Sequence, residues 1–375
     1  MTKPSTQFKF IGEPVIPREN SKRPFVRHDK SSSGKEYVSL SVGIKTSPGN
    51  IGWVEAFDVV KDKIFVYDNN DERIEIDWED RLDERVLKDV AYRSKYFINL
   101  GEDEKYEFIT IYDMIECLEK ILPEHKTERI VFQGTVQRDY YNGNYRNRFN
   151  LNRVRLPIEE MTAKEYNNKL SITGVLYYNK ESLDESDYKE TQKMSLDSYI
   201  LQYINKDEGF KYIPFPVVLS TERFDLSKEI FKKQFEYRMD YLRVKNKVMG
   251  CMYWEMRLVN GADEVEWNPD ELTPAQKRQI ELGVRSPEDF KPRTPIMGNR
   301  ISEVRLVDPI LIDEFGNGDL VPADEDSNNE FYERVYQPPQ DETLAQAKAA
   351  SKAKAKKLAE EKAEDEENPD FDDIF

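Results

Sequence analysis

The sequence is poor in the residues that build disulfide frameworks, metal clusters and the common catalytic sites. Its 375 residues include only two cysteines, Cys117 and Cys251, and two histidines, His28 and His125. Two cysteines exclude a disulfide scaffold and a four-cysteine zinc cluster, and they fit a reducing compartment. No Gly-x-x-x-x-Gly-Lys loop, His-Glu-x-x-His pair or Cys-x-x-Cys pair occurs. We therefore expect a protein that is not an enzyme and that holds no metal ion or other cofactor.

Long apolar runs are absent as well. No window approaches eighteen consecutive apolar residues, and the first residues contain no apolar signal core. These absences predict a soluble, cytoplasmic protein that does not enter a membrane.

The acidic excess is confined to one end of the chain. The formal charge is −17, but residues 311–375 hold 19 acids against 7 bases, and residues 1–310 hold 54 acids against 49 bases. A nearly balanced body can carry a local basic face, so the low overall pI does not exclude nucleic-acid binding. Aromatic residues make up 12% of the chain. Together with local cations, they suit a surface that stacks on flat groups.

The first half of the chain alternates strand and helix signals. Apolar residues recur at every second position in Tyr37–Lys45, and at helical spacing in 109–122. Further expected elements are strands at 7–10, 52–60, 64–67 and 73–78, a helix at 83–97, and a hairpin of 130–141 with 144–156 around Asn142-Gly143. Strands followed by a helix and a long hairpin are the order of an OB barrel.

Residues 168–311 repeat this theme with more insertions. Strands are expected at 170–178, 216–220, 248–259 and 301–312, and helices at 194–205, at 225–243 and after Thr273. The predicted class is mainly β with α insertions (α+β), built as two OB-like barrels and a disordered acidic tail. The predicted domains are residues 1–160, 161–314 and 315–375, the last being a linker and tail.

The hairpin around Asn142-Gly143 supplies the main candidates for nucleic-acid binding. Its register places Phe132, Val136, Phe149 and Leu151 on one face, and amides with Tyr141, Arg146 and Arg148 on the other. Residues 138–155 contain five arginines, Arg138 among them, and one acid. Guanidinium groups beside aromatic rings suit a single strand, because phosphates pair with the first and bases stack on the second. The alternative is an ordinary solvated sheet face with cross-strand pairs.

Three further segments carry candidates of the same kind. The basic segment 18–35 offers Arg23, Phe25 and Arg27, and the following strand offers Tyr37 and Lys45. In the second half, alternation predicts that Trp254 points into the core and that Tyr253 and Arg257 point outward. The alternative for segment 18–35 is a mobile terminus without a ligand.

The C-terminus predicts a binding site for protein partners. Nine of the last sixteen residues are acids, and the chain ends in Asp370, Phe371, Asp372, Asp373, Ile374 and Phe375. This end resembles the acidic C-terminal tail of bacterial single-stranded DNA-binding proteins, without their proline. The length and the Tyr/Asn-rich strands look more like those of a bacteriophage replication protein, in which case the location is the host cytoplasm. The resemblance implies recruitment of polymerase, helicase or primase through Asp372–Phe375.

The leading hypothesis is a protein that binds and protects single-stranded DNA without sequence preference in replication, recombination and repair. Because the tail would compete with DNA for the basic groove, deleting residues 364–375 should tighten DNA binding at low salt. One alternative is a replication or recombination accessory protein that binds protein or promotes annealing. Another is a virion assembly protein. Oligomeric state, and the choice between DNA and RNA, stay open at this point.

Overall fold

The computed structural model describes residues 5–18, 21–31, 34–47, 49–141, 143–157, 168–222, 226–244, 248–262, 264–265, 272–290, 296–297, 300–310, 321–322 and 334–337. The acidic tail and residues Asp370–Phe375 therefore lie outside the described part of the chain. Residues 139–146, the tip of one hairpin, and residues 336–337 belong to a different compact unit from the rest of the described chain, and the hairpin tip is treated by itself.

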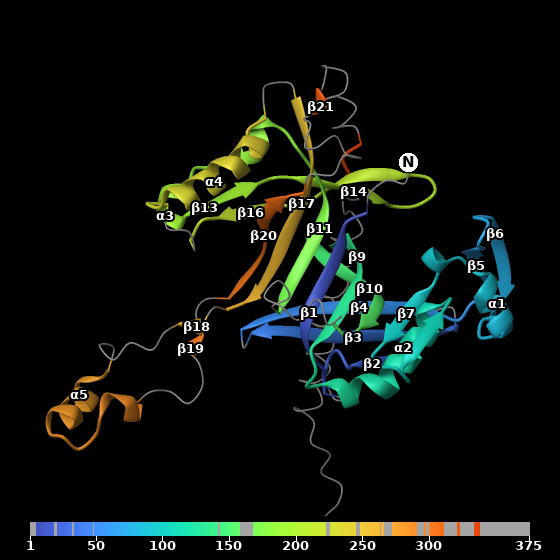
Figure 1. Cartoon of the computed structure of the whole chain (residues 1–375), viewed down its shortest axis with the longest axis horizontal. Coiled ribbons are helices and arrows are strands. Elements are labelled where there is room, and N and C mark those ends of the chain that lie inside the picture. Colours follow the sequence, from blue (N-terminus) through green and yellow to red (C-terminus); the bar gives the residue numbers. More distant parts are fainter. Residues whose placement is uncertain are drawn as a thin grey trace, which may run out of the picture. The chain divides into compact units, whose positions relative to one another are not determined.

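Strands are the main secondary structure of the described chain, with few helices between them (Figure 1). The strands of the first half are β1 (Gln7–Val15), β2 (Val26–Lys30), β3 (Glu36–Ser47), β4 (Asn50–Val59), β5 (Lys63–Tyr67), β6 (Arg73–Asp77), β7 (Tyr96–Asn99), β8 (Lys105–Phe108), β9 (Ile130–Tyr141) and β10 (Asn144–Arg155). Those of the second half are β11 (Lys169–Tyr178), β12 (Leu183–Asp184), β13 (Lys193–Leu196), β14 (Tyr199–Tyr203), β15 (Phe210–Pro214), β16 (Val217–Ser220), β17 (Val248–Gly261), β18 (Glu264–Val265), β19 (Ile296–Met297), β20 (Ile301–Pro309) and β21 (Val321–Pro322). The helices are α1 (Glu84–Asp89), α2 (Ile111–Ile121), α3 (Tyr188–Thr191), α4 (Glu229–Leu242) and α5 (Pro274–Glu281).

Five strands of the first half close into a ring. Strand β1 pairs with β9 through residues 7–12 and with β3 through residues 13–15. The path continues from β3 to β4, from β4 to the parallel strand β10, and from β10 back to β9. We call this path the first ring. Alternation fills its interior, because every second residue of β3, from Val38 to Ile44, is buried with Phe8 and Phe10 of β1.

Close backbone approach helps the first ring to close. Gly134 of β9 lies against the backbone carbonyl of Asn150 on β10, where a methyl group would collide with it. Helix α2, which lies between β4 and β9 in the chain, buries Met114, Ile115 and Leu118, and the Thr110 side chain caps its first turn.

The second half forms a ring with the same strand order. Strand β11 pairs with β14 and with β17, β17 pairs with β20, and β20 runs parallel to β16. The strand pairs β14–β15 and β13–β16 are two parts of one bent ladder. Between them, the Phe215 backbone amide donates a hydrogen bond of 2.7 Å to the Ser198 carbonyl, so the ladder is continuous. Trp254 and Tyr178 fill the interior of this second ring. Helix α4 lies between its third and fourth strands in the chain, the place that α2 occupies in the first.

The two rings share a continuous sheet. Strands β1 and β11 are antiparallel neighbours from Gln7↔Thr173 to Ile11↔Lys169, so β9, β1, β11 and β17 lie side by side (Figure 1). A second junction lies near Asn50 of β4, where the Asn260 amide donates to the Asn50 Oδ1 at 2.8 Å. The domain boundaries expected near residues 160 and 314 stay a prediction.

The structure confirms a mainly β protein with helical insertions, and two of the expected helices are wrong. The stretch 83–97 holds only α1, a 3-10 turn and the start of β7, which pairs with β8 and β10. The stretch 194–205 holds strands β13 and β14 instead of a helix. Its buried residues include Leu196 and Ile200, which are four apart. A helix and a strand both place such a pair on one face, so the spacing did not distinguish them.

Candidate nucleic-acid interface

Aromatic rings and arginines lie together on the outer side of β3 and β4. Because Val54 and Ala56 of β4 point into the first ring, Trp53, Glu55 and Phe57 point outward. Phe57 is 48% exposed, and its ring centroid lies 5.4 Å from that of Tyr37 on β3. This outer surface offers ring faces of the kind on which bases stack.

Arginines border these rings on two sides. Arg27 of β2 is opposite Ser39 of β3, and Ser39 is in turn opposite Phe57 of β4. The guanidinium carbon of Arg27 lies 6.0 Å from the Tyr37 ring centroid. Glu55 lies between two more arginines, with Arg23 Nη1 at 3.7 Å and Arg148 Nε at 3.9 Å. We define the β3–β4 face as the residues Arg23, Arg27, Tyr37, Lys45, Trp53, Glu55, Phe57 and Arg148. It brings together Arg23, Arg27, Tyr37 and Arg148, which the sequence analysis placed in three separate segments, and it extends to Lys45 at the far end of β3.

Two predicted contacts do not belong to this face. Phe25 is only 8% exposed, so its ring belongs to the core and cannot stack on a base. Arg138 points to the side of β9 opposite to Gln137, and its guanidinium carbon lies 5.6 Å from the ring centroid of the buried Phe215. Its backbone amide donates to Gln202 Oε1 at 2.8 Å. Arg138 therefore packs the first ring against the second.

The hairpin tip, residues 139–146, carries two of the predicted residues. Tyr141 is 64% exposed, and the Arg146 guanidinium carbon lies 5.8 Å from the Tyr141 ring centroid. Arg146 Nη2 also lies 3.9 Å from Asp139. The rings of Tyr140 and Tyr145 meet edge to face with centroids 5.0 Å apart, which confirms the register predicted from the two-residue turn.

Three cations that the sequence analysis missed lie with the predicted Arg257 where the two rings join. We define the inter-ring band as Lys9 of β1, Arg155 of β10, Lys169 of β11 and Arg257 of β17. Lys9 is opposite Gln133 on one side and Ser171 on the other, and Ser171 is opposite Arg257. Arg155 Nε donates to Gln133 Oε1 at 3.2 Å. Burial, and then the positive charges of Arg155 and Lys169, lower the pKa of Lys9.

The band collects residues that stand far apart in the sequence. Lys9 is the only cation of the short strand expected at 7–10, and such a single residue gives no local signal. Arg257 is exposed and, among the described residues, makes no ion pair. Tyr253, the other residue predicted on this strand, is partly buried opposite Val175. Lys45 lies at the far end of β3, opposite Glu13.

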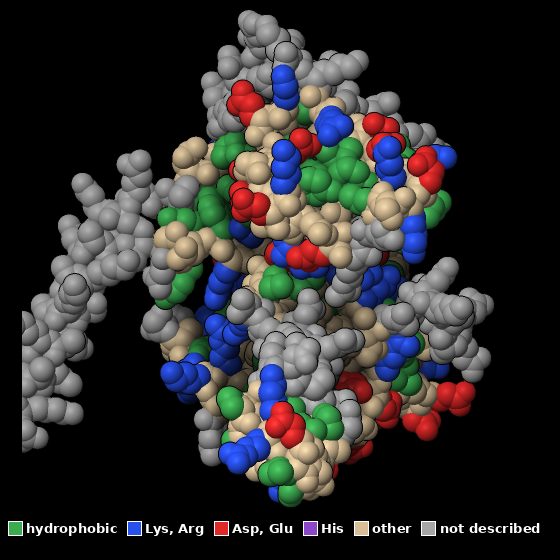
Figure 2. Space-filling model, turned by 90° about the vertical axis from the view of Figure 1, so that its left-hand side faces the viewer, with side chains coloured by type: hydrophobic (Ala, Val, Ile, Leu, Met, Phe, Trp, Pro, Cys, Tyr) green, Lys and Arg blue, Asp and Glu red, His purple; other side chains and the backbone are tan. Residues whose placement is uncertain are grey.

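Basic and acidic side chains are separated on part of the described surface. Figure 2 shows Lys and Arg gathered at mid-height on the left of the view, with Asp and Glu mainly above them and towards the lower right. A molecule with a net charge of −17 therefore still presents a local basic surface.

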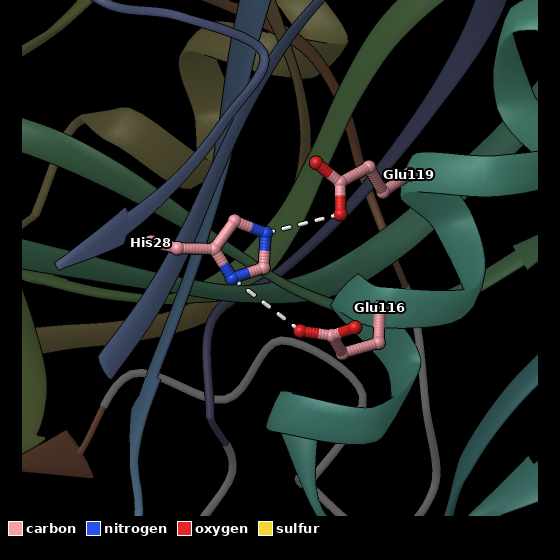
Figure 3. Close-up of side chains that lie close together, drawn as sticks. All are labelled: His28, Glu116 and Glu119. Atoms are coloured by element: carbon pink, nitrogen blue, oxygen red, sulfur yellow. Dashed lines mark hydrogen bonds and ion pairs between the residues drawn. The ribbon is translucent and has the colours of Figure 1, made fainter. Parts of the chain in front are cut away.

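Two other polar groups have partners of their own. In Figure 3, His28 of β2 points between two carboxylates of α2, with Nε2 3.0 Å from Glu119 and Nδ1 3.4 Å from Glu116. Imidazole and carboxylates can ligate a metal ion. Here, however, each carboxylate approaches a different ring nitrogen, which fits a histidine that joins β2 to α2 by two polar contacts.

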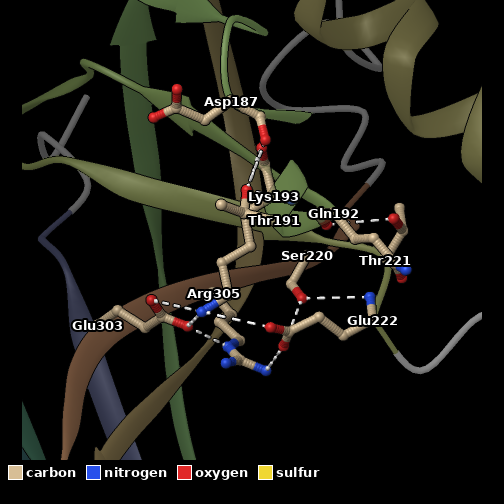
Figure 4. A network of polar contacts seen from close by, with 9 residues as sticks. All are labelled: Asp187, Thr191, Gln192, Lys193, Ser220, Thr221, Glu222, Glu303 and Arg305. Atoms are coloured by element: carbon tan, nitrogen blue, oxygen red, sulfur yellow. Dashed lines mark hydrogen bonds and ion pairs between the residues drawn. The ribbon is translucent and has the colours of Figure 1, made fainter. Parts of the chain in front are cut away.

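The second group closes the second ring. In Figure 4, Lys193 Nζ lies 3.3 Å from Glu303 and 3.5 Å from Glu222, while Arg305 Nη1 lies 3.3 Å from Glu222. These ion pairs join β13, β20 and the end of β16. Because each cation faces two carboxylates, this network is poorly suited to bind phosphate.

No helix in the described part of the chain is long and apolar enough to span a membrane.

No family model and no curated protein matches the sequence. Two solved structures of a single-stranded DNA-binding protein from Thermus aquaticus are similar to the chain. A deletion mutant aligns with a TM-score of 0.29 and 11% identity, covering 72% of this chain and 100% of that one. The wild-type protein aligns with a TM-score of 0.28 and 10% identity, covering 69% and 87%. A likeness this weak supports no inference about the interface.

Proposed function

We propose that this protein binds single-stranded DNA without sequence preference, and that the β3–β4 face is the primary contact. The observation that carries this proposal is the outward aromatic pair Tyr37 and Phe57 with arginines on both sides. Phosphates pair with guanidinium groups, and any base can stack on an aromatic ring, so this set of groups binds a single strand of any sequence.

The order of strands in the first ring supports the proposal. The strands of this ring pair in the order β1–β3–β4–β10–β9–β1, and a helix precedes the fourth strand in the chain. This arrangement is that of an OB barrel. OB barrels bind oligonucleotides on their second and third strands and with the loops that follow the first and fourth. Those strands are β3 and β4 here. Arg23 and Arg27 lie in the segment of the chain that connects β1 to β3.

A duplex fits the β3–β4 face less well. Its bases are stacked on one another and present edges instead of faces, so the two aromatic rings gain nothing from it. A preference for the single strand is therefore the signature that separates this function from general attraction to polyanions.

The C-terminal residues Asp370–Phe375 complete the proposal. The acidic charge and apolar end of these residues suit a basic pocket on a replication protein. While it is bound to unwound DNA, the present protein would recruit that partner in replication, recombination or repair.

The test is a fluorescence-anisotropy titration of the full chain with a labelled oligothymidine of about thirty nucleotides and with a matching duplex. We expect a preference of about a hundredfold for the single strand, with affinity falling as salt rises. Equal affinity for both, or no binding, would overturn the proposal and favour an accessory protein that acts through its tail.

A further inference from the structure

A second group of aromatic rings with an arginine lies at the end of β10 in the first ring. The guanidinium carbon of Arg153 lies 4.8 Å from the ring centroid of Phe97 on β7. It lies 5.1 Å from the ring centroid of Tyr92, which is in the 3-10 turn before β7. The Tyr92 ring centroid is 4.4 Å from that of Phe97. Tyr92 is 62% exposed, so its ring can still receive a flat group from the solvent.

These three residues line a cavity of about 300 Å³. Lys105 of β8 lines it as well, and it is opposite Asn99, which is two residues after Phe97 on β7. Lys105 therefore points to the same side of the sheet as Phe97. We define the β7 pocket as the residues Tyr92, Phe97, Lys105 and Arg153. Its volume lies at the lower end of the range of small-molecule sites, about 300–1,000 Å³, so the pocket has room for one nucleotide unit.

The charge of the β7 pocket favours an anion. Within the described chain, neither Arg153 nor the exposed Lys105 makes an ion pair. Among the described residues that line the cavity, the only carboxylate is that of Glu107, and Lys95 Nζ lies 2.9 Å from it. A guanidinium that packs on aromatic rings keeps its N–H donors in its own plane, where a phosphate can accept two of them. Arg153 can therefore contact the rings and a phosphate at the same time.

Strand β10 connects the β7 pocket to the β3–β4 face. It runs parallel to β4 at Asn150↔Glu55 and parallel to β7 at Arg153↔Phe97. These two positions are three residues apart on β10, which corresponds to about 10 Å. Because Glu55 belongs to the β3–β4 face, the two sites are neighbours along one strand.

Both sites open on the same side of the sheet. Val154 of β10 and Ile98 of β7 are buried. By alternation, their neighbours Arg153 and Phe97 face away from the core, as Phe57 does on β4. A single strand can therefore pass from one set of rings to the other without crossing the sheet.

We infer that the β7 pocket binds a nucleotide of the same single strand that stacks on the β3–β4 face, with its base on the Tyr92 ring and its phosphate on Arg153. This inference rests on the proposed function and extends the contact with the strand to a second set of rings. The two contacts differ in their response to salt. Stacking is independent of salt, whereas a phosphate contact releases counterions and weakens as salt rises.

The test measures Tyr92→Ala, Arg153→Gln and Arg153→Lys by fluorescence anisotropy, with a labelled oligothymidine of about thirty nucleotides over a range of salt. Tyr92→Ala should weaken binding about 5- to 30-fold at every salt concentration, which is the lower part of the range for one stacked base. Arg153→Gln should reduce the slope of log K against log salt by about 0.7, the contribution of one phosphate contact. Arg153→Lys keeps the charge and should keep the slope.

The β5–β6 hairpin offers a matched control. There the guanidinium carbon of Arg73 lies 4.4 Å from the ring centroid of Phe65, which is 55% exposed. This hairpin is a separate two-stranded sheet and does not continue the surface of β10. Phe65→Ala with Arg73→Gln therefore removes the same kinds of group as Tyr92→Ala with Arg153→Gln. The control should leave both the affinity and the slope nearly unchanged.

Cross-linking gives a second readout that needs no substituted protein. Ultraviolet irradiation of the full chain with oligothymidine joins bases to the rings on which they stack, and mass spectrometry then identifies the modified peptides. We expect adducts at Tyr92 as well as at Tyr37 and Phe57. Adducts at Tyr37 and Phe57 without any at Tyr92 would overturn the inference.

Each result separates this inference from the proposed function. If the wild type binds single strand and duplex equally, the proposed function itself fails. If the wild type prefers the single strand but the Tyr92 and Arg153 variants match the control, only the inference about the β7 pocket is wrong. It is equally wrong if the effect of these variants disappears after deletion of residues 364–375, because the pocket would then bind the acidic tail.

Discussion

Replacing Tyr37 and Phe57 together by alanine removes the contacting aromatic pair of the β3–β4 face without changing the charge of that face. Both residues point outward, and the buried residues of β3 and β4 lie on the opposite side of the strands. The free energy of unfolding should fall by only about 1 kcal/mol, through loss of the contact between the two rings.

The loss in affinity follows from the geometry of the pair. The two rings are tilted by 43° with centroids 5.4 Å apart, so they can receive two bases but not the same base. A stacked base contributes about 1–3 kcal/mol, and half-buried Tyr37 should lie at the low end of that range. The pair should therefore contribute about 2–4 kcal/mol, which is about 30- to 700-fold in Kd.

The assay is an anisotropy titration with oligothymidine at several salt concentrations, and the control is Phe65→Ala with Tyr67→Ala. These two rings are 55% and 44% exposed on β5, outside the proposed interface. We expect a large loss for the first variant, with an unchanged salt slope, because no cation is removed. Equal effects of the two double variants, or an effect below about threefold, would refute a stacking role for this face.

Three further predictions concern other contacts of the fold. Glu55→Gln frees Arg23 and Arg148 from the carboxylate between them, and should tighten DNA binding about two- to fivefold in the same titration. Burial lowers the pKa of His125, but its two carboxylate neighbours outweigh this and raise it. The stabilisation that His125 provides is therefore complete below pH ~6.5 and is lost as pH rises through the raised pKa. The variant His125→Gln should remove this pH dependence from the urea-unfolding midpoints. Gly134→Ala would push β9 away from β10 and should cost about 3 kcal/mol or more, measured by urea unfolding, whereas an alanine at the open position Gly101 should cost much less.

Local signals in the sequence determined most of the individual elements. The alternation in Tyr37–Lys45 and the Asn142-Gly143 turn predicted strands and register that the structure confirms, and the helix expected at 109–122 is present as α2. Thr273 caps α5 as expected, with its hydroxyl accepting from the Gln276 amide. These features depend on residues within one turn or one hairpin, so the order of residue types is enough to specify them.

Only the tertiary structure decided which strands are neighbours and which cations share a surface. Phe25 carries the same local signal as an exposed aromatic, but closure of the first ring buries it. Arg138 and Arg148 lie on one hairpin and point to opposite sides, where one meets the second ring and the other meets Glu55. Lys9 and Arg257 approach each other because β1 and β17 both pair with β11. Strand pairing over such separations depends on the packing of the whole core, which no short segment of the sequence encodes.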